Sequence, residues 1–187
     1  MILDEKKKAI PLTDVDLLDA FIPENGQRWV TEDSTSSKTI ISYSFPNSFE
    51  LWRSLDVKYD YDGYTNSDEP NADQVSGLNE TQKANFRLAL DEWEAVANIE
   101  FREVTDWFFS GGTIRTAFSS AVPDGTSALT YLPQSSGSAA GDMWIDYEHS
   151  TWDFEPGSYG FHLLVHELGH AIGLNHPFED PSFEYPS

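Results

Sequence analysis

The sequence predicts an α+β fold in which two long helices accompany a sheet of five short strands. Two segments carry apolar residues at the spacing of an amphipathic helix, and five others carry β-branched and aromatic residues between Gly, Pro or Ser. The chain has 187 residues, of which 39% are hydrophobic, so it can bury a core of its own. We expect a domain at residues 38–187, preceded by an arm or prosegment-like region at residues 1–37.

The strand signals are short and are bounded by turn-forming residues. The first, residues 39–45, places Ile41, Tyr43 and Phe45 on one face and ends before a proline. The other four predicted strands are residues 99–104, 113–119, 128–132 and 142–146. Residues 56–76 and 147–157 have no regular period, so we expect loops there.

The helix signals are longer. Residues 79–98 repeat an apolar side chain every three or four positions, at Phe86, Leu90, Trp93 and Ala97. Asn79 and Gln82 can form a capping pair at the start of this helix. The second helix, residues 161–174, has the same kind of apolar face. We expect the apolar faces of both helices to pack in the core.

Composition excludes several classes of partner and site. The net charge is −21, from 32 acidic and 11 basic residues, and such a surface repels a nucleic-acid backbone. No run approaches the roughly 20 apolar residues of a membrane span, and the first twelve residues contain no signal-peptide core. The chain has no cysteine, which rules out disulfides, thiolate metal sites and cysteine nucleophiles.

Acidic residues of the first long loop have two interpretations. They form a solvated acidic surface, or some of them bind Ca²⁺ through carboxylate oxygens. Their spacing does not match an EF-hand loop, so calcium is the weaker of the two hypotheses. The residues concerned are Asp60, Asp62, Asp68, Glu69 and Asp73.

The second helix contains the pattern His-Glu-x-x-His, formed by His166, Glu167 and His170. Residues four apart on a helix are offset by only about 40°, so the two histidines project side by side and can share one ion. Imidazole nitrogens are common zinc ligands. Glu167 lies beside them, where it can contact a zinc-bound water without being a ligand.

A catalytic zinc needs a third protein ligand, and His176 is the candidate. It lies too far along for the same helix to present it. Gly173 can adopt the left-handed conformation that ends a helix, so the chain can turn back toward the metal. Such histidines could instead pack or cap by chance, but five specified positions within eleven residues favour a metal site. We expect His162 to be a surface or supporting histidine.

The complete string from His166 to His176 resembles the metzincin zinc-protease motif. The resemblance continues in the order of strands and helices, in residues 141–146, and in residues 174–178, which are most similar to serralysin-type bacterial proteases. It implies a twisted mixed sheet and zinc held by the three histidines. It also implies a secreted, extracellular endopeptidase that binds protein or peptide substrates along an edge strand, here residues 128–132, with Glu167 as general base.

One departure from the family pattern affects what we expect of the chain. Metzincins continue to a methionine-containing turn beneath the zinc, whereas the two methionines here, Met1 and Met143, both precede the zinc helix. We therefore expect a chain truncated after the third histidine, with the C-terminal subdomain largely absent. The alternative function is a zinc-binding but catalytically inactive fragment that acts as a scaffold or interaction module.

Overall fold

The computed structural model describes residues 29, 38–46, 75–106, 111–120, 122–133 and 140–176. The elements in chain order are β1 (Thr39–Ser44), β2 (Val75–Ser76), α3 (Glu80–Val96), β3 (Ile99–Glu103), β4 (Ile114–Ser119), β5 (Ala128–Thr130), β6 (Met143–Asp146), the 3-10 turn η1 (Tyr147–His149) and α4 (Tyr159–Ala171). Both predicted helices and all five predicted strands are confirmed. The acidic residues considered for calcium lie outside the described ranges.

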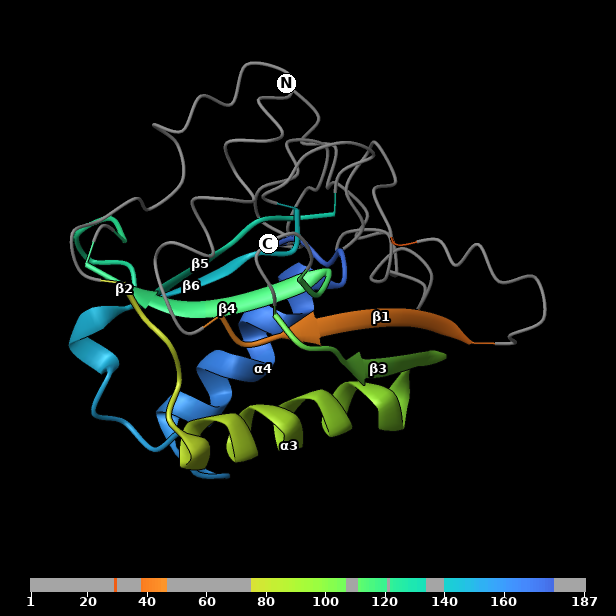
Figure 1. Cartoon of the computed structure of the whole chain (residues 1–187), viewed down its shortest axis with the longest axis horizontal. Helices are drawn as coiled ribbons and strands as arrows, with labels where there is room; N and C mark the ends of the chain where they lie inside the picture. Colours follow the sequence, from red (N-terminus) through yellow and green to blue (C-terminus); the bar gives the residue numbers. More distant parts are fainter. Residues whose placement is uncertain are drawn as a thin grey trace, which may run out of the picture.

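The sheet is mixed, with the strand order β3-β1-β4-β6-β5. Neighbouring strands in this order are parallel except β5, which runs antiparallel to β6 at one edge, and the sixth strand, β2, pairs antiparallel with β4 outside this order. Both helices lie on the same side of the sheet (Figure 1). The predicted α+β class with a mixed sheet is therefore confirmed.

One boundary of the predicted first loop is wrong. Its last two residues form β2, which pairs antiparallel with Ser119 and Phe118 of β4. A strand of two residues is too short to show a period, so its identity depends on the partner strand rather than on local sequence. The loop predicted at residues 147–157 likewise begins with the short turn η1.

The core lies between the sheet and the two helices. Phe86 of α3, Phe118 of β4 and Leu168 of α4 are at most 1% exposed. The indole Nε1 of Trp93 donates to the Val165 carbonyl at 3.0 Å and so joins α3 to α4. A side chain at Gly169 would meet the Trp93 ring at 3.1 Å, so glycine there lets the two helices approach closely.

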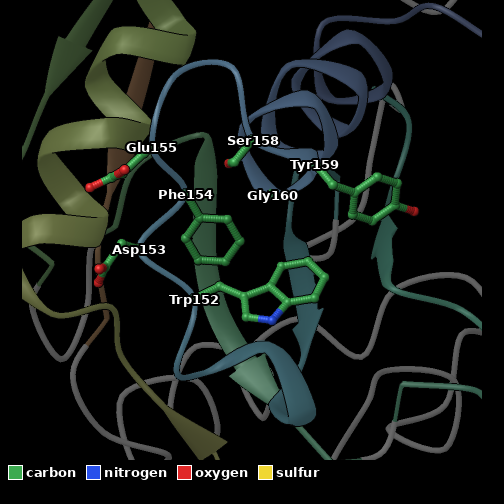
Figure 2. Close-up of a pocket in the computed structure, with 7 residues that line it drawn as sticks. All are labelled: Trp152, Asp153, Phe154, Glu155, Ser158, Tyr159 and Gly160. Carbon is green, nitrogen blue, oxygen red and sulfur yellow. The ribbon is translucent and has the colours of Figure 1, made fainter.

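The loop between η1 and α4 is rich in aromatic residues. His149 stacks on Trp152, with ring centroids 3.8 Å apart. Trp152, Phe154 and Tyr159 line a hollow of about 380 Å³ at the first turn of α4, and the carboxylates of the acidic lining residues extend away from these rings (Figure 2). This hollow lies at the other end of α4 from His170.

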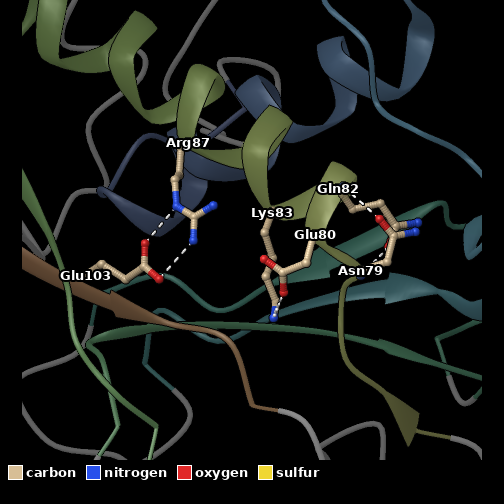
Figure 3. Close-up of polar contacts among 6 residues, drawn as sticks. All are labelled: Asn79, Glu80, Gln82, Lys83, Arg87 and Glu103. Atoms are coloured by element: carbon tan, nitrogen blue, oxygen red, sulfur yellow. Dashed lines mark hydrogen bonds and ion pairs between the residues drawn. The ribbon is translucent and has the colours of Figure 1, made fainter.

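Polar contacts fix the start of α3. Asn79 and Gln82 form the predicted capping box, in which each side chain accepts a hydrogen bond from the other residue's backbone N–H (Figure 3). The Gln82 amide nitrogen also donates to the carbonyls of Ser150 and Trp152, each at 2.8 Å. One buried side chain therefore caps a helix and anchors the loop that leads into α4.

A bidentate ion pair connects α3 to the edge strand β3. Arg87 donates to both carboxylate oxygens of Glu103, at 2.7 and 2.9 Å (Figure 3). The Tyr43 hydroxyl also donates to Glu103, at 3.0 Å. Burial, reinforced by this carboxylate, raises the pKa of Tyr43 to about 12.

Candidate metal centre

Helix α4 begins and ends with recognisable caps. The Ser158 side chain accepts a hydrogen bond from the backbone of Phe161 at the start. At the other end Gly173 has φ of 112°, a value that disfavours any side chain. Its N–H donates to the His170 carbonyl and that of Leu174 to the Gly169 carbonyl, each at 2.9 Å, which is the Schellman arrangement. The turn predicted at this glycine is confirmed.

This turn brings the three predicted histidines together. The Nε2 atoms of His166, His170 and His176 form a triangle whose sides are 3.1, 3.1 and 3.2 Å. A tetrahedral zinc with Zn–N distances near 2.0–2.1 Å places two ligand nitrogens roughly 3.3 Å apart. The donor type, number and spacing therefore fit a zinc ion.

The orientation of His170 is set by the same turn. Its Nδ1 lies 2.8 Å from the Leu174 carbonyl oxygen. Because a carbonyl only accepts, Nδ1 carries the proton and Nε2 keeps its lone pair for a metal. The backbone that ends the helix thus also fixes the tautomer of one of the three histidines.

Burial, followed by the neighbouring histidines, lowers the pKa of His166. The lower pKa favours the neutral imidazole, which is the form that binds metal. His162 is exposed, with its ring centroid 6.3 Å from that of His166, and it is not one of the converging ligands. The expectation of a surface histidine is confirmed.

Glu167 is not one of the three residues whose ligand atoms converge, and 6% of its surface is exposed. Its Oε2 accepts a hydrogen bond of 2.6 Å from the Thr130 hydroxyl, at the end of β5. Burial raises the pKa of Glu167, against the opposing effects of Thr130, His170 and His176. The result is a carboxylate next to the three histidines whose proton affinity is increased.

Thr130 is a residue of the site that could not be identified from the sequence. It lies 37 residues before Glu167, in a strand that was predicted from its own residues and the turn-forming residues around it. No local spacing connects the two residues. The available signal was indirect: Thr130 lies in the predicted substrate-binding strand, and Glu167 lies in the His-Glu-x-x-His motif.

Trp29 lies in the predicted N-terminal arm yet contacts the end of α4. Its indole packs against the core, and Nε1 donates to the Ala171 carbonyl at 2.7 Å. Ala171 follows His170 directly, so this contact supports the segment that carries two of the histidines.

Comparison with known proteins places the sequence in a protein family. The matrixin model of M10 peptidases matches residues 51–187. A metallopeptidase, AprA, of Pseudomonas marginalis is 31% identical over 161 residues, which are 82% of this chain and 33% of that protein. Serralysin A of Dickeya chrysanthemi is 41% identical over 104 residues, which are 54% of this chain and 22% of that protein.

A serralysin of Photorhabdus luminescens is 32% identical over 155 residues, 80% of this chain and 28% of that protein. The chain thus spans about a fifth to a third of the length of these relatives. None of the helices in the described part of the chain has the length and the apolar composition of a membrane span. The matched model and the shared identity show that the chain belongs to the matrixin family of M10 metalloproteases, with serralysin-type proteins among its relatives.

Proposed function

We propose that the chain is the catalytic portion of a zinc endopeptidase that hydrolyses peptide bonds in extended protein substrates. The observation that carries the proposal is the convergence of three histidine Nε2 atoms within 3.2 Å of one another, beside a buried glutamate. Family membership supports the same reaction class. It also supports an extracellular location, because the relatives are serralysin-type proteases.

His166, His170 and His176 would hold the zinc ion. Three protein ligands are typical of catalytic zinc, in contrast to the four of closed structural sites. When bound, Zn²⁺ supplies Lewis-acid polarisation of a carbonyl and lowers the pKa of a water molecule.

Glu167 is the proposed general base. Thr130 occupies Oε2, which leaves Oε1 as the oxygen that receives a proton from the attacking water. Oε1 then returns that proton to the leaving amine, so that the peptide bond breaks to a free amine and a carboxylic acid. Burial favours this role, because it brings the pKa of the carboxyl group closer to neutral pH.

The substrate would bind along β5. This strand lies at the edge of the sheet and pairs on one side with β6. An extended peptide can add to such an edge through backbone hydrogen bonds, with its side chains alternating between the two faces. The strand ends at Thr130, which contacts Glu167, so the edge leads directly to the proposed base.

The proposal is tested by zinc analysis and peptide hydrolysis in the parent and in Glu167→Gln. Glutamine keeps the shape and loses the base, so we expect zinc content to be retained and turnover to fall by roughly 10²–10⁴-fold. Equal turnover in the two zinc-loaded proteins would contradict the role of Glu167. A parent that binds zinc and cleaves no peptide would instead support the inactive scaffold.

A further inference from the structure

The contact between Thr130 and Glu167 joins the metal-binding helix to the edge strand. The hydroxyl Oγ1 of Thr130 lies 2.6 Å from Oε2 of Glu167. Side chains alternate along a strand, so Thr130 and Ala128 share the face toward α4 while Leu129 lies on the other face. The side chain of Thr130 therefore points toward α4 and donates its hydrogen bond to Glu167.

The backbone N–H and C=O of Thr130 point away from β6. The Tyr131 N–H donates to the backbone carbonyl of Asp142 at 3.0 Å, and the Ser127 carbonyl accepts from the backbone N–H of Asp146 at 2.9 Å. Residues in an antiparallel pair alternate between those bonded to the partner and those that are not. Thr130 lies between bonded positions, so its N–H and C=O point to the outer edge, where an added strand would pair.

We propose that Thr130 is a positioning residue that fixes Glu167 relative to the substrate-binding edge. The proposal rests on the proposed function. A carboxylate held at one oxygen can no longer rotate freely, so Oε1 is presented in one direction. Thr130 would then contact the peptide through its backbone and Glu167 through its side chain. This single residue would align the peptide with the base, with no flexible segment between them.

The test compares Thr130→Val, which removes the hydroxyl and keeps the branched shape, with Thr130→Ser, which keeps the hydroxyl. Thr81→Val is the matched control, because it makes the same change on the exposed surface of α3. The probe is a peptide hydroxamate, which chelates zinc and donates a hydrogen bond to the adjacent base. Its Kd for each zinc-loaded protein is measured by calorimetry, beside kcat and KM for a fluorogenic peptide.

We expect Thr130→Val to weaken hydroxamate binding and lower kcat, each by roughly tenfold or more, with zinc content and KM unchanged. Thr130→Ser should recover most of both losses, and Thr81→Val should match the parent. If valine lowers Tm, Thr130→Ala provides a second hydroxyl-free protein for the same comparison. Loss of hydroxamate affinity in Thr130→Ser equal to that in Thr130→Val would overturn the proposal, because the hydroxyl would then have no role.

Different outcomes would overturn the proposed function and the role of Thr130. A parent that binds neither zinc nor the hydroxamate overturns the proposed function, and the role of Thr130 with it. A parent that binds both, with Thr130→Val indistinguishable from it, overturns only the role of Thr130.

Discussion

The indole Nε1 of Trp29 donates to the backbone carbonyl of Ala171 at 2.7 Å, across 142 positions of the chain. Ala171 is the last residue of α4, where carbonyls have no partner within the helix. The contact thus satisfies a helix end directly after His170. It connects Trp29, which precedes β1 in the chain, to the end of the helix that carries the motif.

Replacing Trp29 with Phe should therefore affect both stability and metal binding. Loss of the hydrogen bond should cost about 1 kcal/mol, which corresponds to a Tm lower by roughly 2–4 °C. Zinc affinity should fall severalfold, because the end of α4 is less well fixed. Trp152→Phe is the control, since it makes the same change in the hollow at the other end of α4. Equal zinc affinity in the two variants would contradict the link to the metal site.

Removal of a ligand should be distinguishable from removal of a nearby histidine. His170→Ala deletes one corner of the Nε2 triangle, so zinc affinity should fall by at least about a hundredfold. His162→Ala removes an exposed histidine of the same helix and should leave zinc affinity unchanged. Competition with a chelating dye measures both. Parental zinc binding in His170→Ala would show that the site is misassigned.

Gly173 should be required for the position of His176. Alanine at φ of 112° is strained, and we expect a stability loss of about 1–3 kcal/mol together with weaker zinc binding. Gly125 also has positive φ, of 82°, and a side chain there meets no atom within 4 Å. Gly125→Ala should therefore reduce stability without changing zinc affinity. The two variants are compared by urea unfolding and zinc titration, and parental zinc binding in Gly173→Ala would contradict the prediction.

Alkaline unfolding should report on Tyr43. Its pKa is about 12 in the folded chain and near 10 when unfolded, so above pH 10 the unfolded state loses a proton that the folded state retains. The corresponding stability is complete below pH 10 and is lost as pH rises toward 12. Tyr43→Phe should remove this component and make the free energy of unfolding fall less steeply over that window. If the free energy of unfolding falls equally steeply with pH in parent and variant, the raised pKa of Tyr43 would be contradicted.

Local sequence determined the elements and the grouping of the three histidines. The helix from Glu80 to Val96 follows from the apolar repeat and the capping pair Asn79 and Gln82, because both signals act within one or two turns. The three histidines lie within eleven residues, so a helix and one glycine turn are enough to bring their nitrogens together. For such a site, spacing along the chain determines spacing in space.

Tertiary structure alone decided the contacts that orient this site. Thr130 meets Glu167, and Trp29 meets Ala171, through packing between segments far apart in sequence. The pairing of β2 with β4 and the placement of β5 at the sheet edge also depend on long-range hydrogen bonds. The local sequence of a short strand or a single side chain does not indicate which distant residue it will contact. The sequence therefore specified which groups could bind zinc, while the fold specified which residues hold them in place.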